Sequence, residues 1–154
     1  MPATAIAVRP FTRPDVPQLH DLMLALADFE GYDLAVTPDD IIKRGLGTSP
    51  QFEALVAHRE GSDMLLGMAV TYLIPYTYSL KPTMVLKELY VTEEARGAGV
   101  GEALFNAVKA RAAAGDCGQL IWTVVPWNEK AKLFYAKLGG RPEEQWQSWV
   151  CDAL

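Results

Sequence analysis

Hydrophobic and polar positions alternate with two different periods along this chain of 154 residues. Residues 4–9 alternate with period two and predict a first strand, because successive strand side chains point to opposite faces. The next apolar positions recur every three or four residues, which predicts an amphipathic helix with one buried stripe. That stripe consists of Val16, Leu19, Leu22, Met23 and Leu26.

Two segments carry the signals of a helix start. The run Thr12-Arg13-Pro14-Asp15 combines a threonine cap, a proline in the first turn and an aspartate that can reach back to the cap. The run Thr37-Pro38-Asp39-Asp40 repeats this pattern and adds a second acid near the positive end of the helix. We therefore predict two consecutive helices, the second ending near residues 45–47.

The remainder of the pattern predicts strands interrupted by two more helices. Six further strands are expected, at residues 52–58, 64–74, 84–91, 119–124 and, as a short final pair, within 144–151. The additional helices begin near Val100 and Asn128. The order β-α-α-β-β-β-α-β-α-β-β predicts an α/β fold in a single domain, residues 1–154, with helices on both faces of a mixed central sheet.

A glycine-rich turn joins the expected strand 84–91 to the following helix. Its sequence is Arg96-Gly97-Ala98-Gly99-Val100-Gly101. Glycines let the backbone pass close to a phosphate, and the N–H groups and dipole of the helix start favour an anion there. Strand, turn and helix in this order indicate an anion-binding cradle, and a glycine turn without a ligand is the alternative.

Three kinds of phosphate loop can be compared with this turn. A Walker loop ends in Gly-Lys-Ser/Thr, whereas Gly101 is followed by Glu102 and Ala103. The dinucleotide fingerprint Gly-x-Gly-x-x-Gly has a different last spacing and opens a βαβ unit, which does not precede this turn. The spacing Arg-x-x-Gly-x-Gly resembles the pyrophosphate loop of the GNAT superfamily of acetyl-coenzyme A-dependent N-acetyltransferases.

A second motif supports this resemblance. The segment 128–135 is similar to the Asn-x-x-Ala-x-x-Phe-Tyr helix of the same superfamily, and Gly139 ends it. Its apolar face is formed at helical spacing by Ala131, Phe134, Tyr135 and Leu138. Asn128 suits the N-cap and Gly139 the left-handed C′ position.

Other segments resemble one branch of the superfamily, the diamine (spermidine/spermine) and thialysine acetyltransferases. These segments are 28–32, 45–57, Trp127-Asn128 and Trp146. The resemblance implies that Tyr135 is the general acid and that Glu30 helps to bind the amine. It also implies two adjacent acids before the end of the central strand, where this chain has Lys87-Glu88.

The lysine puts the family's assignment of the base in question. Strand alternation sends Lys87 and Glu88 to opposite faces, so Glu88 replaces the missing acid only if a bulge re-aims it. We predict Tyr135 and Glu88 as the catalytic pair. The predicted cofactor residues are Leu89, Tyr90, Val91, Arg96, Gly97, Ala98, Gly99, Val100, Gly101, Glu102, Asn128, Ala131 and Phe134. The predicted substrate residues are Phe29, Glu30, Asp33, Lys87 and Trp127.

Composition restricts the possible partners. The formal charge of −5 disfavours nucleic acid as a main partner and permits a cationic substrate. No apolar run is long enough for a membrane helix, and no secretion signal is visible. Two scattered cysteines and two scattered histidines predict neither a metal site nor a disulfide framework, so a cytoplasmic location is expected.

These observations together predict an enzyme that acetylates a primary amine of a small cationic substrate, a polyamine or a lysine-like amino acid, with acetyl-coenzyme A as co-substrate. The alternatives are an aminoglycoside or protein-amine acetyltransferase, and a catalytically weak acyl-coenzyme A-binding module. A homodimer is also expected. Trp146, Trp149 and Val150 place large apolar groups near the end of the chain, and the branch itself is dimeric.

Overall fold

The computed structural model describes residues 5–76 and 79–153, and its backbone contacts divide the chain into two compact units. The first unit, Met1–Thr123, contains a five-stranded sheet, and the second, Val124–Leu154, contains helix α4 (Glu129–Lys137). Each unit is described by itself. Thr4, which begins the first predicted strand, lies outside the described residues.

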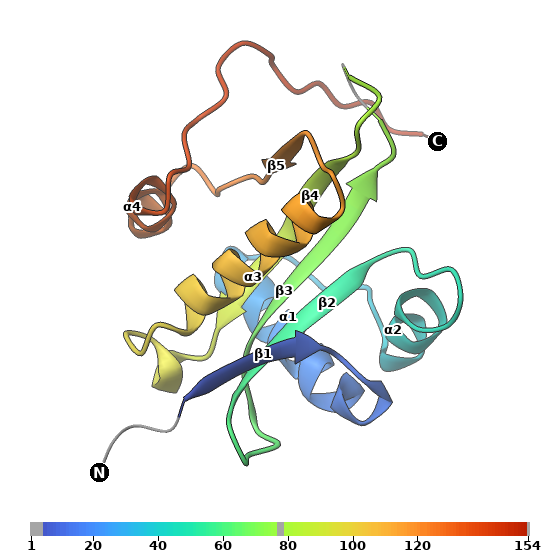
Figure 1. Ribbon diagram of the computed structural model, residues 1–154, viewed down its shortest axis with the longest axis vertical. Helices are drawn as coiled ribbons and strands as arrows, with labels where there is room; N and C mark the ends of the chain where they lie inside the picture. Colours follow the sequence, from blue (N-terminus) through green and yellow to red (C-terminus); the bar gives the residue numbers. More distant parts are fainter. Residues whose placement is uncertain (1–4, 77–78, 154) are drawn as a thin grey trace. The chain divides into compact units, whose positions relative to one another are not determined.

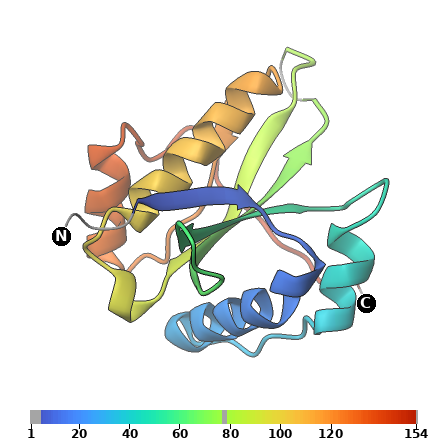
Figure 2. The ribbon, with the colours of Figure 1, turned by 60° about the horizontal axis from the view of Figure 1, so that its bottom comes forward.

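The sheet of the first unit has its strands in chain order (Figure 1). The strands are β1 (Ile6–Pro10), β2 (Glu53–Arg59), β3 (Leu65–Ile74), β4 (Thr83–Val91) and β5 (Gln119–Ile121). The first four are antiparallel neighbours and β5 runs parallel to β4, so the sheet is mixed as predicted. The helices of this unit are α1 (Val16–Glu30), α2 (Pro38–Gly45) and α3 (Val100–Ala114). Helices α1 and α2 cover one face of the sheet and α3 the other (Figure 2).

The two predicted helix starts are confirmed. The backbone N–H of Thr12 donates to Asp15 Oδ2 at 2.7 Å, at the short 3-10 turn η1 (Arg13–Asp15) before α1. At α2 the Thr37 N–H donates to Asp40 Oδ2 at 2.9 Å, and the Asp40 N–H donates back to Thr37 Oγ1 at 3.2 Å. Both starts therefore satisfy backbone donors that a helix end leaves without partners.

The core between α1, α2 and the sheet contains the predicted stripe of α1. All five predicted stripe residues are buried, and they pack with Ile41 of α2 and with Val56, Met68 and Val70 of the sheet. On the opposite face, α3 buries Val100, Leu104, Phe105 and Val108. The sheet is thus packed between the apolar faces of α1 and α2 on one side and of α3 on the other. This packing positions β4 relative to α1 and α3.

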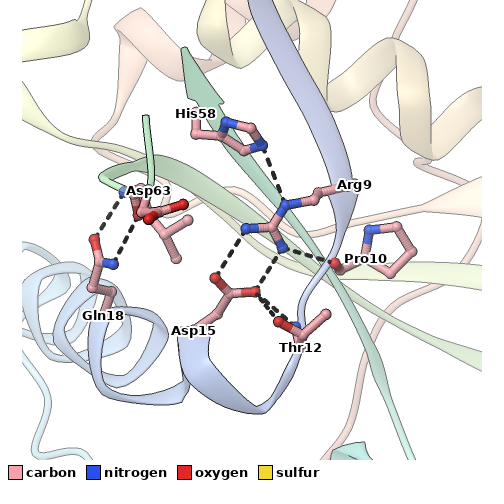
Figure 3. A network of polar contacts seen from close by, with 8 residues as sticks. Arg9, Pro10, Thr12, Asp15, Gln18, His58 and Asp63 are labelled. Carbon is pink, nitrogen blue, oxygen red and sulfur yellow. Dashed lines mark hydrogen bonds and ion pairs between the residues drawn. The ribbon is translucent and has the colours of Figure 1, made fainter. Parts of the chain in front are cut away.

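An ion pair between the half-buried Arg9 and the buried Asp15 joins the start of α1 to β1, and Arg9 also contacts β2 (Figure 3). Arg9 donates to the two carboxylate oxygens of Asp15 at 2.6 and 3.0 Å, and its Nε donates to His58 Nε2 at 3.2 Å. The bond from Arg9, the Thr12 N–H and the Thr12 hydroxyl lower the pKa of Asp15 to about 2, against the opposing effect of burial. Because Nε2 of His58 accepts, its Nδ1 carries the proton and donates to the Arg59 carbonyl at 2.8 Å.

Two predicted strands differ from the structure. Strand β5 ends at Ile121 rather than at residue 124, because it diverges from β4 after the pair Val85–Ile121. The prediction of a final strand pair within 144–151 is wrong, since no strand is assigned among the described residues 141–153. Alternation alone does not supply a hydrogen-bonding partner, and an isolated two-stranded hairpin is only marginally stable.

Within the described part of the chain, no helix combines the length and the apolar character needed to cross a membrane.

Candidate functional site

Strand β4 contains a bulge at Lys87-Glu88, where the family resemblance implies two adjacent acids. Its pairing with β3 shifts register, since Glu88 faces Val70 while Leu86 faces Thr71, which leaves Lys87 as the extra residue. Lys87 is exposed and Glu88 is half-buried. A bulge re-aims the side chains that follow it, so the structure supplies the condition under which Glu88 can take the position of an inward-facing acid.

The same region of β4 has an open edge. Pairing with β5 covers Thr83–Val85 only, and the described strand pairs leave residues 86–91 without a neighbour on that side. A groove of about 300 Å³ opens where the two strands separate. It is lined by Tyr72, Ile74, Val85, Leu86, Lys87, Ile121, Trp122 and Thr123. The predicted cofactor residues Leu89, Tyr90 and Val91 thus lie on a strand segment whose backbone can pair with an extended ligand.

The glycine-rich turn has the geometry of an anion cradle. Gly97 and Gly99 adopt left-handed conformations, with φ of 82° and 83°, and α3 begins directly after Gly99. Ideal Cβ atoms at either glycine would meet no heavy atom within 4 Å, so the turn is open around its backbone. Glu102 lies in the first turn of α3, and the chain reaches the cradle through the 3-10 turn η2 (Glu93–Ala95).

Gly67 of β3 explains how α3 approaches the sheet closely enough to present this cradle. A Cβ at Gly67 would lie 2.7 Å from the Tyr90 carbonyl oxygen and 3.0 Å from Leu104 Cδ1. Glycine inside a strand is typical of such a close approach. The sequence analysis did not identify Gly67, although an isolated glycine within the apolar run 64–74 was a usable signal.

Glu88 is a half-buried acid with one buried oxygen. Its Oε2 atom is inaccessible to solvent and has no hydrogen-bond partner among the described residues. Burial raises the pKa of the Glu88 carboxyl above its ordinary value, the Lys87 charge lowers it, and the Glu30 charge raises it. A carboxylate whose pKa is raised and whose oxygen has room for a further hydrogen bond is a better proton acceptor than an exposed one.

Glu88 shares its surroundings with the C-terminal end of α1. Burial and the charges of Glu88 and Glu30 all raise the pKa of the Tyr32 phenol. The backbone N–H groups of Gly31 and Tyr32 both donate to the Ala27 carbonyl, at 2.8 and 3.0 Å, which ends the helix. Two acids near the negative end of a helix dipole favour a cation. Tyr32 was absent from the predicted site.

Other predicted residues of the first unit lie around this helix end. Asp33 is exposed just beyond it, and Phe29 is exposed in its last turn. The guanidinium carbon of Arg96 lies 6.0 Å from the centre of the Phe29 ring and 5.6 Å from that of Tyr90. The structure thus brings residues predicted for the cofactor and for the substrate into contact at Arg96.

The second unit presents its predicted residues on and before α4. The Ala131 N–H donates to Asn128 Oδ1 at 3.1 Å, which confirms Asn128 as the N-cap. Gly139 has φ of 95° and donates its N–H to the Ala136 carbonyl at 3.1 Å, as expected for the C′ position. Tyr135 is half-buried, with its ring edge-to-face on Phe134 at 5.2 Å.

Trp127 lies before α4 with 58% of its surface exposed. In its loop the Asn128 N–H donates to the Val125 carbonyl at 2.9 Å. The loop therefore leads the chain directly from an exposed tryptophan into the capped helix start.

Comparison with known proteins gives a consistent result. Residues 19–140 match the model of the acetyltransferase (GNAT) family. Thialysine N-epsilon-acetyltransferase of Mus musculus is 26% identical over 152 residues, covering 93% of this chain and 88% of that protein. Spermidine/spermine N(1)-acetyltransferase-like protein 1 of Homo sapiens is 24% identical, covering 88% of this chain and 20% of that protein.

A solved structure shows the same fold. An aminoglycoside acetyltransferase from an uncultured soil metagenomic sample, crystallised with sisomicin, superposes with a TM-score of 0.78 at 20% identity. The superposition covers 97% of each chain. With a family match that spans most of its length, the chain belongs to the GNAT family of acetyltransferases, enzymes that use acetyl-coenzyme A.

Proposed function

We propose that this acetyltransferase acts on a primary amine of a small cationic substrate, a polyamine or a lysine-like amino acid. The observation that carries the proposal is the half-buried Glu88 carboxylate, with its unpartnered oxygen, on the strand that leads into the glycine cradle. The names of the relatives, a thialysine acetyltransferase and a spermidine/spermine acetyltransferase-like protein, support this substrate class.

The proposed cofactor site follows β4 into α3. The pantetheine arm pairs with the open backbone edge at Leu89–Val91, and the pyrophosphate accepts from N–H groups of residues 97–102. The open edge and the left-handed glycines support this assignment. Asn128, Ala131 and Phe134 of the second unit are proposed as cofactor residues on the strength of the family motif alone.

Glu88 is proposed to accept the proton that the amine must lose. An alkyl ammonium has an ordinary pKa of about 10.4, so it is not a nucleophile at neutral pH. Since burial raises the pKa of Glu88, the carboxylate is a stronger base than an exposed glutamate. The neutral amine then attacks the thioester carbonyl, and a strand N–H within 89–91 stabilises the resulting oxyanion.

Tyr135 is proposed to protonate the leaving thiolate. A phenol of ordinary pKa about 10 can donate to a thiolate whose conjugate acid has a pKa of about 8.5 once the thiolate develops charge. The placement of Tyr135 on the capped helix α4 and the family motif support this role. The nitrogen loses two protons in all, one to Glu88 before it attacks and one as the tetrahedral adduct collapses to the amide. The thiolate gains one proton, so ammonium and acetyl-coenzyme A give amide, free thiol and one proton that leaves to solvent.

The acceptor is proposed to bind at the end of α1. Glu30 and Glu88 offer negative charge there, and a third carboxylate, that of Asp33, is exposed nearby in the chain. Lys87 is exposed, which disfavours a second ammonium beside it and favours one further along α1. A substrate with two amines separated by a short chain fits this distribution of charge.

An aminoglycoside or a protein amine is the second candidate acceptor. The fold is similar to that of an aminoglycoside acetyltransferase crystallised with sisomicin, and this similarity supports the second candidate. The release of free thiol from acetyl-coenzyme A distinguishes the candidates when spermidine, thialysine, lysine, sisomicin and a lysine peptide are compared. Turnover of spermidine or thialysine well above the others is the expected result.

The Glu30→Gln variant sharpens this experiment. It should raise KM for a diamine more than for a monoamine of similar length, because only the diamine carries a distal ammonium. Glu60→Gln, in an exposed turn, is the matched control. Equal changes in KM for the two amines would contradict the role of Glu30. A protein that binds coenzyme A but releases no free thiol from acetyl-coenzyme A with any amine would be a binding module.

The chain is also proposed to form a homodimer through residues near its C-terminus. Trp146, Trp149 and Val150 are 64%, 90% and 95% exposed, which is unusual for large apolar side chains. The intact chain should sediment as a dimer at micromolar concentration, and truncation after Glu144 should give monomer or insoluble protein. A monomeric intact chain would refute the proposal.

A further inference from the structure

Arg96 makes contacts with three elements of the first unit. Its Nε donates to the Val91 carbonyl oxygen at 3.1 Å, at the end of β4. Its guanidinium carbon lies 5.6 Å from the centre of the Tyr90 ring and 6.0 Å from that of the Phe29 ring. Arg96 itself begins the glycine turn, since the left-handed Gly97 follows it directly. One side chain therefore joins the cradle, the strand end and the last turn of α1.

The two rings belong to the elements that carry the proposed acceptor site. Phe29 precedes Glu30 in α1. Tyr90 lies two residues after Glu88, and the register with β3 is regular between these positions, so the two side chains share a face of β4. The guanidinium thus lies near Phe29, which adjoins Glu30, and near Tyr90, which shares a strand face with Glu88. The Glu30 charge acts on the Glu88 carboxyl.

The chemistry of arginine suits this arrangement better than that of lysine. A planar guanidinium can stack on aromatic faces and still donate sideways from Nε, whereas an ammonium has no such plane. In the described structure the Nε donor is directed to the Val91 carbonyl, and the guanidinium carbon lies over the Tyr90 and Phe29 rings. A direct phosphate ligand would instead direct the guanidinium fork at the cradle.

We propose that Arg96 is a positioning residue that clamps the last turn of α1 to the strand end carrying Glu88, and so couples occupancy of the cradle to order in the acceptor site. This inference rests on the proposed function, because it takes the cradle as the cofactor site and the end of α1 as the acceptor site. Ligand held at residues 97–102 restrains Arg96, and Arg96 restrains Phe29. By linkage, an acceptor that orders α1 must then favour coenzyme A binding to the same extent.

The test is hydrogen exchange of the full-length protein with coenzyme A as the probe. In the wild type, coenzyme A should slow exchange at residues 96–102 and also at residues 24–34. We expect about a fivefold slowing at 24–34, the lower end of typical coupling between sites. In Arg96→Met the slowing at 96–102 should persist and that at 24–34 should disappear.

Two further variants separate positioning from phosphate binding. Arg96→Lys keeps the charge that a phosphate needs but loses the planar stack and the Nε donor, so it should behave as Arg96→Met does. Phe29→Leu should reproduce the same loss of coupling with Arg96 intact. Arg111→Met is the matched control, since Arg111 is an exposed arginine of α3 that pairs with Glu53 at 3.0 Å. It should leave the coupling unchanged.

The outcomes distinguish the inference from the function on which it rests. Weaker coenzyme A binding by about tenfold in Arg96→Met, restored in Arg96→Lys, would make Arg96 a phosphate ligand and overturn the inference. If the wild type bound no coenzyme A in calorimetry, the proposed function would fail. Faster exchange at residues 24–34 in ligand-free Arg96→Met would still support the clamp, and unchanged exchange there would refute it.

Discussion

The Asp15→Asn substitution tests the ion pair between β1 and the start of α1. Asp15 is 5% exposed and accepts from Arg9 at 2.6 and 3.0 Å and from the Thr12 N–H at 2.7 Å. An asparagine has nearly the same shape, keeps one acceptor oxygen and removes the charge. The new amide N–H2 faces a donor where a carboxylate oxygen accepted, which adds a cost that does not depend on pH. The pH-dependent part of the change in the free energy of unfolding therefore measures the electrostatic contribution of the carboxylate.

The pKa of Asp15 gives the magnitude. The pKa falls from 3.8 to about 2 in the folded protein, which corresponds to about 2 kcal/mol of stability at neutral pH. Because the folded pKa is lowered, this contribution is present above pH 4 and is lost as the pH falls through 2. At pH 2.5 about a third of it should remain. For a chain of this size the melting temperature at pH 7 should fall by roughly 4–8 °C.

The assay is urea unfolding of wild type and variant in buffers between pH 2.5 and 7. The difference in unfolding free energy should be near its full value at pH 7 and should shrink steadily below pH 4. Asp39→Asn is the control, because Asp39 is exposed and lies 3.8 Å from Lys43 in a surface pair. Such pairs contribute about 0.3–0.5 kcal/mol. A difference for Asp15→Asn that stayed constant from pH 7 to 2.5 would refute the electrostatic explanation.

Three further expectations concern the proposed site. Gly99→Glu should abolish measurable coenzyme A binding in calorimetry, because it puts a negatively charged side chain on a left-handed residue of the cradle. Gly61→Glu controls for the backbone strain of a left-handed non-glycine residue, since Gly61 has φ of 79° in an exposed turn, and this variant should bind coenzyme A normally. Tyr135→Phe should lower kcat by about 10²–10⁴-fold with little change in coenzyme A affinity, and near-normal turnover would remove Tyr135 from the mechanism. Lys87→Met should raise the pKa of Glu88 further, since the Lys87 charge lowers it. The acidic limb of the pH profile of kcat/KM should then move to higher pH, and an unmoved limb would show that Glu88 is not the titrating base.

The sequence predicted those parts of the structure that depend on local pattern. The stripe of α1 follows from period, and the caps at Thr37 and Asn128 follow from side chains that reach backbone groups three residues away. The glycine turn before α3 and the left-handed Gly139 after α4 followed from residue type and position. In these cases the physical cause lies within a few residues of its effect.

The parts that were missed depend on contacts between distant segments. The bulge at Lys87 is a mismatch between β4 and β3, and no pattern within β4 alone reveals it. The environment of Glu88 depends in turn on that bulge and on the end of α1. The final strands were predicted from alternation, which indicates suitability for a sheet without supplying a partner strand.

The open edge of β4 has a consequence for the handling of the protein. Residues 86–91 present backbone N–H and C=O groups on the side where β5 has already diverged. An unpaired strand edge is a template for any other extended chain, including a neighbouring molecule of the same protein. A ligand that pairs with this edge would also remove the template. Aggregation during purification should therefore decrease when coenzyme A is present and return when it is dialysed away.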